Sequence, residues 1–200
     1  MHSGGEGLKN FIGIPDDSFI RGRIPMTKQE VRILTIAKLC LPENGVIADI
    51  GAGTGSLSIE AALQMPQGHV FSIERKPEGI ELIRANAAKF EVSNISIIEA
   101  EAPDGMDKLP DLDAAVIGGS GSKLSPILEV LDKKLKPGAH LVLNCVTLQT
   151  ISQASDWLRS TDAGYTYEII QVQVNRWDQI GPYDMAKALN PIFILTAVKK

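Results

Sequence analysis

Three glycines at alternate positions follow a short apolar run near the start of the chain. The run is 46–50, and the glycines are Gly51, Gly53 and Gly55, within the sequence Asp-Ile-Gly-Ala-Gly-Thr-Gly. Glycine lets the backbone turn sharply and leaves its amides open to a ligand, and a helix N-terminus that follows favours polar groups. Turns of this kind after a buried strand accept nucleotides and related molecules. The sequence therefore predicts a nucleotide-like ligand at the end of this run.

The spacing of the glycines distinguishes three kinds of nucleotide-binding turn. A P-loop requires Gly-Lys-Ser or Gly-Lys-Thr, which the chain does not contain. A dinucleotide-binding turn requires a third glycine where Ser56 stands. The observed turn, which includes Asp49, Ala52 and Thr54, is the arrangement used for S-adenosylmethionine, a ligand without phosphates. The other interpretation is a helix start without a ligand, capped by Thr54 or Ser56.

Two acidic residues after the next two apolar runs give a second signal. Glu74 stands about 20 positions beyond the glycines, where a carboxylate can accept both ribose hydroxyls of an adenosine. Glu101, after the following run, is placed to accept the adenine amino group, with the Ala102 amide beside it. Each also has a plainer interpretation, because Glu74 could pair with Arg75 at the surface and Glu99 could serve in place of Glu101. Since parallel strands end at one edge of a sheet, we expect these groups to share one crevice.

Apolar runs alternate with amphipathic segments through most of the chain, which is typical of parallel strands with helices on both faces. We expect an α/β, three-layer, Rossmann-like fold with a mostly parallel sheet of seven strands. The last two runs, 165–174 and 191–198, have no convincing helix between them and predict an antiparallel C-terminal pair. Thr27 and Glu30 have capping-box spacing, so a helix should start there and end before Pro42. The other expected strands span 46–50, 69–74, 95–99, 114–118 and 139–145, and the other expected helices span 55–65, 77–90, 122–135 and 150–160.

The length and composition of the chain indicate one globular domain. Its 200 residues are 44% hydrophobic and 22% charged. We expect an irregular arm over residues 1–26, which are rich in Gly, Pro and Asp, and one domain over 27–200. The net charge of −4 argues against nucleic acid as the main partner, and no apolar run is long enough to cross a membrane. Because Cys40 and Cys145 have no CxxC partner and the N-terminus lacks a signal pattern, we expect buried, reduced thiols, no metal site and a cytoplasmic location.

In this order, the glycine turn, Glu74 and Glu101 resemble the class I S-adenosylmethionine-dependent methyltransferases, and the resemblance spans about 46–198. A narrower likeness involves three further segments. They are similar to the decarboxylating precorrin methyltransferases of cobalamin biosynthesis, in the stand-alone rather than the fused form. The segments are Gly13 to Phe19 (GIPDDSF), Pro25 to Arg32 (PMTKQEVR) and Asp113 to Gly121 (DAAVIGGSG).

The resemblance implies a reaction, a cofactor and partners. The reaction is methylation of carbon-15 of cobalt-precorrin-6B by S-adenosylmethionine, with loss of the ring C acetate carboxyl group as carbon dioxide. A homo-oligomer such as a tetramer and a separate partner precorrin methyltransferase are also implied. Glu74 and Glu101 stand where Asp is common in the family, and the extra methylene still permits the ribose contact. The candidate cofactor-binding residues are Thr27, Asp49, Gly51, Ala52, Gly53, Thr54, Gly55, Glu74, Arg75, Glu101 and Ala102.

The loop 118–121 follows the fourth expected strand, where this fold exposes its substrate. Its glycines would let a flat ring approach the backbone, and Ser120 could hydrogen-bond a carboxylate, although the loop could also be a flexible turn before the helix at Lys123. A tetrapyrrole carries several carboxylates, for which Arg is a suitable bidentate partner. No residue stands out as a catalytic acid or base. The candidate substrate-binding residues are Arg21, Arg23, Gly118, Gly119, Ser120, Gly121 and Arg176, although each arginine taken singly also fits a solvated surface residue.

Other functions are compatible with the same glycine turn. A protein or RNA methyltransferase would use the same cofactor, but an RNA enzyme usually has an Asn/Asp-Pro-Pro-Tyr/Phe motif where this chain has the loop 113–121. A non-enzymatic sensor or scaffold would bind the cofactor without consuming it. A plain NAD-binding module is disfavoured by the glycine spacing.

Overall fold

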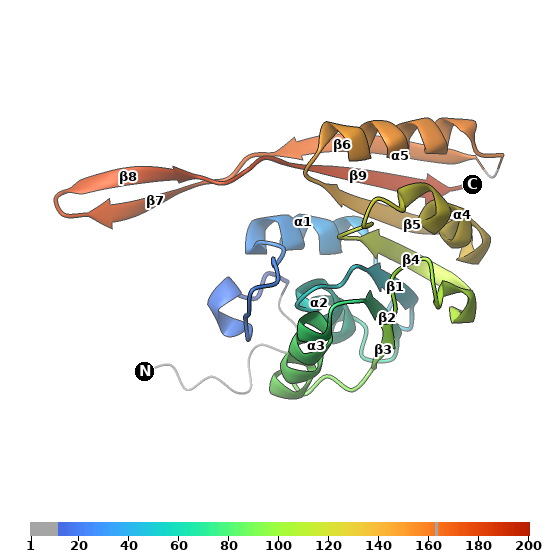
Figure 1. Cartoon of the computed structure of the whole chain (residues 1–200), viewed down its shortest axis with the longest axis horizontal. Coiled ribbons are helices and arrows are strands. Elements are labelled where there is room, and N and C mark those ends of the chain that lie inside the picture. Colours follow the sequence, from blue (N-terminus) through green and yellow to red (C-terminus); the bar gives the residue numbers. More distant parts are fainter. Residues whose placement is uncertain (1–11, 163) are drawn as a thin grey trace.

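The computed structural model describes residues 12–162 and 164–200, so residues 1–11 of the expected arm lie outside the described part. A seven-stranded sheet has the strand order β3-β2-β1-β4-β5-β9-β6 (Figure 1). The strands from β3 to β5 run parallel, and β9 is antiparallel to both of its neighbours. These features confirm the predicted fold class. The strands of this sheet are β1 (Val46–Ile50), β2 (His69–Glu74), β3 (Ile95–Glu99), β4 (Leu112–Ile117), β5 (Leu135–Cys145), β6 (Tyr165–Val172) and β9 (Ile192–Lys199).

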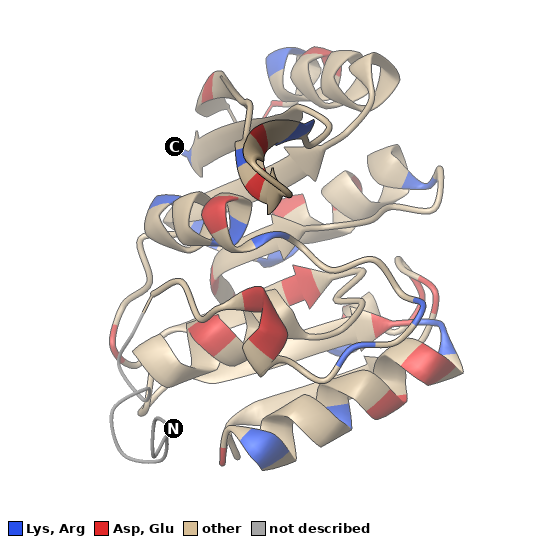
Figure 2. Cartoon of the chain, turned by 90° about the vertical axis from the view of Figure 1, so that its left-hand side faces the viewer, with Lys and Arg blue, Asp and Glu red and all other residues tan. Residues whose placement is uncertain are grey.

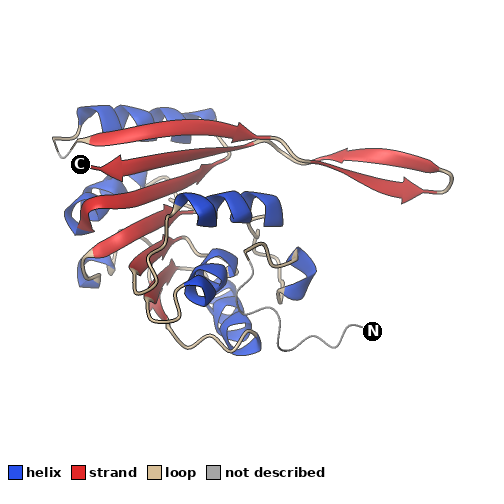
Figure 3. Ribbon diagram, turned by 180° about the vertical axis from the view of Figure 1, so that it is seen from behind, coloured by secondary structure: helices blue, strands red, loops and turns tan. Residues whose placement is uncertain are grey.

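Helices cover both faces of the sheet, as Figure 3 shows. On one face α1 packs on α2 and α2 packs on α3, while α4 and α5 pack together on the other face. β1 and β4 are neighbours in the sheet, and the chain winds outward from them in both directions. Ligands bind at such a switch point in open α/β sheets. The helices are η1 (Asp16–Ser18), α1 (Gln29–Lys38), α2 (Ser56–Gln64), α3 (Pro77–Lys89), η2 (Met106–Lys108), α4 (Leu124–Lys134) and α5 (Leu148–Ser160).

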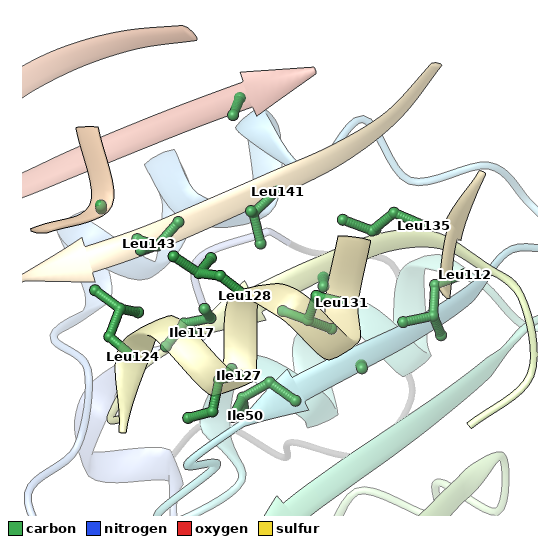
Figure 4. Packing of buried hydrophobic residues seen from close by; sticks show 14 of the residues in the cluster. Ile50, Leu112, Ile117, Leu124, Ile127, Leu128, Leu131, Leu135, Leu141 and Leu143 are labelled. Carbon is green, nitrogen blue, oxygen red and sulfur yellow. The ribbon is translucent and has the colours of Figure 1, made fainter. Parts of the chain in front are cut away.

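Alternate residues of the central strands belong to two separate cores, one on each face. In β1, Ile47 packs in the core beneath α1 and α2, whereas Ile50 packs in the core beneath α4 and α5. Figure 4 shows Ile50 and Ile117 together with Ile127 of α4. Burying each such side chain contributes about 1.5 to 3 kcal/mol. The central strands are therefore fixed from both sides, which holds their carboxyl ends in place.

A hairpin that the sequence did not predict lies between β6 and β9. Its strands β7 (Asn175–Ile180) and β8 (Tyr183–Ala188) pair only with each other within the described chain and extend beyond the sheet (Figure 1). All residues of both strands are exposed. The predicted antiparallel pair of β6 and β9 is confirmed, and the segment between them is a hairpin rather than a loop.

A buried ion pair fixes the described part of the arm to the sheet domain. Arg32 of α1 and Glu60 of α2 are both fully buried, and the Arg32 Nε donates to the Glu60 carboxylate. The same carboxylate accepts the backbone amides of Gly13 at 2.9 Å and Ile14 at 3.0 Å. Arg32 also donates to the carbonyls of Ile14 and, at 2.6 Å, Thr27. The arm is therefore held by α1 and α2 at both of its ends.

The structure corrects two smaller expectations, on the start of α1 and on the cysteines. The capping-box prediction is wrong, because α1 begins at Gln29 after the cap residue Lys28 and has no side-chain cap. Cys145 is buried as expected, but Cys40 is exposed because it follows the last turn of α1.

Acidic and basic residues are intermixed on the face drawn in Figure 2. Within residues 12–162 and 164–200, no helix is long and apolar enough to cross a membrane.

Candidate active site

Three adjoining clefts lie along the edge of the sheet where the parallel strands end. The first, of about 240 Å³, lies between Ile24 and Pro25 of the arm, the ends of β2 and β3, and the loop 118–121. The second, of about 210 Å³, lies between arm residues 25–28, the turn after β1, and Asn144. The third, of about 150 Å³, lies between the same loop and the end of β5. Gly118 lines all three clefts, so they adjoin one another along one crevice at the sheet edge.

The turn after β1 requires glycine at the positions where it meets other backbone. Gly51 has a φ of +70°, and a Cβ atom there would lie 2.5 Å from the carbonyl oxygen of Gly119. Gly53 has a φ of +60° and would bring a Cβ to 3.3 Å from the carbonyl oxygen of Pro25. Both residues line the first and second clefts. Gly55, with a φ of +78°, is the cap residue of α2, lies against Ile83 of α3 and lines none of the three clefts.

Glu74 lies at the end of β2 and is 7% exposed. Its Oε2 accepts the backbone amide of Gly53 at 2.8 Å, and its Oε1 accepts those of Arg75 at 3.0 Å and Lys76 at 2.8 Å. The carboxylate lines the first cleft and ties the glycine turn to the end of the neighbouring strand.

Asp49, the second to last residue of β1, is a buried carboxyl with an unused oxygen. The Ser58 hydroxyl donates to its Oδ2 at 2.6 Å, whereas Oδ1 has no hydrogen-bond partner among the described residues. Burial raises the pKa of Asp49 to about 6, and the nearby Glu74 charge acts in the same direction. The Oγ1 of Thr54 in the same cleft is also buried without a described partner. The second cleft therefore has buried polar atoms that a polar or cationic ligand would satisfy.

Glu101 belongs to an ion-paired group at the outer side of the first cleft. It pairs with Arg75 at 2.5 Å and with Lys123 at 3.1 Å. The hydrogen bond from Lys123, together with the charges of Lys123 and Arg75, lowers the pKa of the Glu101 carboxyl. These three residues come from the segments after β2, after β3 and before α4. The ion pairs therefore join three loops beside the crevice.

The structure brings most of the other predicted site residues to the crevice. Thr27, Ala52 and Thr54 line the second cleft, and Ala102 and the loop 118–121 line the first. Arg75 also lines the first cleft, but the three arginines predicted to bind substrate lie outside these linings. Arg21 and Arg23 are exposed, and no ion pair of either is found in the described part of the chain. Arg176 lies on β7, where it donates to both Glu30 oxygens at 2.9 Å and lies 3.8 Å from Asp16.

Sequence reasoning missed several residues of the crevice. Asn144, Val146 and Thr150 line its third cleft, at the end of β5 and the start of α5. The rule that ligands bind beyond the carboxyl ends of strands applies to β5 as well, so this rule could have found Asn144. Ile24 and Pro25 of the arm gave no comparable signal, because their place depends on the buried Arg32.

The comparison with known proteins identifies the family. The sequence profile described as "Precorrin methyltransferase domain" matches residues 18–199. This chain belongs to the precorrin methyltransferase family. It is 39% identical over 188 residues to a Pyrobaculum aerophilum protein named "Probable cobalt-precorrin-6B C(15)-methyltransferase (decarboxylating)", which covers 92% of this chain and 95% of the relative.

Solved structures agree with this membership. The crystal structure of precorrin-6y C5,15-methyltransferase from Geobacter metallireducens has a TM-score of 0.88 and 44% identity, covering 94% of this chain and 97% of that one. The S-adenosylmethionine-dependent O-methyltransferase of Thermotoga maritima, at 17% identity and a TM-score of 0.74 over 88% of this chain and 67% of that one, shares the fold alone. The chain is thus a precorrin methyltransferase with the class I methyltransferase fold.

Proposed function

We propose that this precorrin methyltransferase methylates carbon-15 of cobalt-precorrin-6B and removes the ring C acetate carboxyl group as carbon dioxide. The observation that carries the proposal is that the three clefts adjoin. Gly51 and Gly53 line two clefts, and Gly118 lines all three. A methyl donor in one cleft and a flat acceptor in another would therefore lie next to each other. The name of the Pyrobaculum relative supports the choice of substrate and of the decarboxylating reaction.

S-adenosylmethionine fits the residues of the first two clefts. We assign its ribose to Glu74, its adenine to the side of the first cleft formed by Glu101 and Ala102, and its amino acid part to the second cleft. Asp49 Oδ1 and Thr54 Oγ1 support the last assignment, because they are buried polar atoms without described partners. When bound, this cofactor supplies an electrophilic methyl group. The chain's own contribution is to hold the two reactants in line and to exclude water.

Other residues are proposed to contact the cofactor or the substrate. Thr27, Ala52 and Arg75 line or border the same clefts, and Gly55 keeps the start of α2 close to them. Arg23 directly precedes Ile24 of the first cleft, so Arg21 and Arg23 are our candidates for outer carboxylates of the substrate. Arg176 remains a further candidate, at the base of the hairpin. No acid or base is assigned, because the conjugated ring itself can accept the electron pair that decarboxylation leaves.

The direct test is mass spectrometry of the reaction products. Cobalt-precorrin-6B is incubated with the protein and S-adenosylmethionine that carries a labelled methyl group. We expect a product that has gained one labelled methyl group and lost one carbon dioxide. Methyl gain without that loss would contradict the decarboxylating assignment and leave the cofactor assignment intact. Competition between NAD and S-adenosylhomocysteine for the crevice provides an independent check on the cofactor.

We also propose a homo-oligomer, such as a tetramer, that assembles through the hairpin. Residues that face each other across the β7–β8 pair point to the same side, so Ile180, Tyr183 and Met185 share one face. They are 58%, 71% and 54% exposed, respectively. A two-stranded hairpin is marginally stable alone, and these three exposed apolar side chains, which share the face with Asp178, would be buried by a partner surface. A second copy supplies an identical face. A partner precorrin methyltransferase and a cytoplasmic location, consistent with two free thiols, complete the proposal.

A further inference from the structure

The third cleft differs from the other two in the charge of its walls. The first cleft is lined by two carboxylates and two cations, and the second contains Asp49 and Lys28. Every residue that lines the third cleft is uncharged. Its polar side chains are those of Ser120, Asn144 and Thr150, and the rest of its surface is glycine and apolar side chain.

The side chain of Asn144 has a defined position and an unused donor. Its Oδ1 accepts the hydroxyl of Thr35, a fully buried residue of α1, at 3.0 Å, and Asn144 lines the second cleft as well as the third. The Asn144 Nδ2 is buried and has no hydrogen-bond partner among the described residues. A buried amide donor without a partner costs free energy, which a bound acceptor would recover. On the other wall, at the start of α5, the hydroxyl oxygens of Thr150 and Thr147 are 2.8 Å apart.

An uncharged, polar site is suited to a carboxylate that must leave as carbon dioxide. The carboxylate carries a full negative charge before the reaction and loses it as the carbon–carbon bond breaks. A lysine or arginine beside it would stabilise the starting carboxylate more than the transition state and so slow the step. Neutral hydrogen-bond donors can orient the group at much smaller cost, and exclusion of water removes the hydration that would otherwise stabilise it.

We infer that the third cleft holds the acetate group that leaves, with Ser120 and Thr150 as neutral positioning residues in its walls and Asn144 at its border with the second cleft. This inference rests on the proposed function. In the step, the bond between the acetate methylene and its carboxyl carbon breaks and carbon dioxide departs. The electron pair enters the conjugated ring, and the methylene carbon takes up one proton from water to become a methyl group. The other carboxylates of the substrate remain outside this cleft, where cations can pair with them.

Opposite charges at Thr150 test the inference. Thr150→Lys places a cation beside the leaving carboxylate, and Thr150→Asp places an anion there, at an early helix position where Asp is favourable. Gln149→Lys is the matched control. Gln149 is next to Thr150 in the chain, but its side chain is exposed and lines none of the three clefts. Decarboxylated and methylated products are counted separately by mass spectrometry, and S-adenosylhomocysteine affinity is measured for each variant.

Thr150→Lys should lower KM for cobalt-precorrin-6B and lower kcat for carbon dioxide loss by about tenfold. Thr150→Asp should instead raise KM, because its anion repels the carboxylate. Gln149→Lys should resemble the unchanged protein, and all three should keep their S-adenosylhomocysteine affinity. Equal effects of Lys and Asp at position 150, or equal effects of Lys at 149 and 150, would overturn the inference.

Ser120→Ala provides a second readout, because the loop is exposed and tolerant of the change. It should reduce carbon dioxide loss, and S-adenosylhomocysteine affinity is measured in parallel because Ser120 also lines the first cleft. An unchanged rate of carbon dioxide loss in this variant would count against the neutral-donor role. If the unchanged protein neither methylates nor decarboxylates the substrate, the proposed function fails instead. If it does both while the Thr150 variants behave alike, only the assignment of the cleft fails.

Discussion

The Glu74 carboxylate and the Gly53 backbone amide are joined by a hydrogen bond of 2.8 Å. This bond couples the end of β2 to the glycine turn after β1. The two segments lie 21 positions apart in the chain. Their union defines the inner wall of the first cleft, where we place the ribose of the cofactor.

Replacing Glu74 by Gln should weaken binding of S-adenosylhomocysteine by at least about tenfold, since hydrogen bonds to a charged group contribute about 1.5 to 3 kcal/mol. The amide nitrogen of Gln would also face backbone N–H groups. Isothermal titration calorimetry measures the effect. Glu99→Gln is the control, because Glu99 is the register partner of Glu74 at the end of β3 but is exposed. Equal affinities in the two variants would remove Glu74 from the binding site.

Alanine at Gly51 and at Gly119 should have different consequences, although the two residues are in contact. Gly51→Ala combines a left-handed φ with a contact of 2.5 Å to the Gly119 carbonyl oxygen, and should cost about 1 to 3 kcal/mol of stability. Gly119→Ala meets nothing within 4 Å and should leave the melting temperature nearly unchanged. Thermal denaturation of both variants measures this difference in stability. A stable Gly51→Ala protein would show that the turn tolerates a side chain.

The stability of the ligand-free protein should depend on pH through Asp49. Its pKa is raised from 3.8 to about 6 in the folded protein. The folded state therefore holds this proton more tightly than the unfolded state, and its contribution to stability is lost as pH rises from about 4 to about 6. The full penalty above pH 6 is roughly 3 kcal/mol. Melting curves of Asp49→Asn should lack this part of the pH dependence and show higher stability at pH 7. A variant that melts below the unchanged protein at pH 7 would contradict the assignment.

Breaking the buried Arg32–Glu60 pair should release the arm before the sheet unfolds. Removal of one partner leaves an uncompensated buried charge, which costs about 3 to 5 kcal/mol. In Arg32→Met, trypsin should cleave faster after Arg21 and Arg23, which are exposed. Arg84→Met is the control, because Arg84 forms only exposed ion pairs. Identical digestion of both variants would mean that the arm is held by its apolar contacts instead.

The proposed oligomer should depend on one face of the hairpin. Met185→Ser and Ile180→Ser should lower the molar mass observed by light scattering at micromolar concentration. Gln179→Ser, on the opposite face, should leave the mass unchanged. A monomeric unchanged protein, or loss of assembly in the Gln179 variant alone, would exclude this surface as the interface.

The central strands were predictable because burial on both faces leaves a continuous apolar run with clear ends. The expected ranges 46–50 and 69–74 coincide with β1 and β2, and 95–99 coincides with β3, a half-buried edge strand. The glycine turn and Glu74 were found for the same reason, since each directly follows such a run. Site residues that directly follow a parallel strand can thus be predicted from the local sequence.

The remaining features depend on contacts between distant segments. β7 and β8 carry no buried face in the chain itself, so their alternation gives no burial signal. Arg32 lies in an amphipathic helix, where an arginine usually indicates a solvated side, and only the fold shows that Glu60 neutralises it. Glu30 was assigned to a helix cap, yet Arg176, 146 positions away, takes its carboxylate. Sequence spacing alone cannot reveal such partners.

At Gly118, a substitution that the fold tolerates would still affect the crevice. Its backbone is not in the left-handed region, and an added Cβ would meet only ordinary contacts at 3.4 Å and 3.9 Å. The chain could therefore accept alanine here without strain. That methyl group would nevertheless stand at the junction of the three clefts, narrowing the passage through which donor and acceptor must approach each other. A substitution at this position would therefore alter an opening rather than a packing contact.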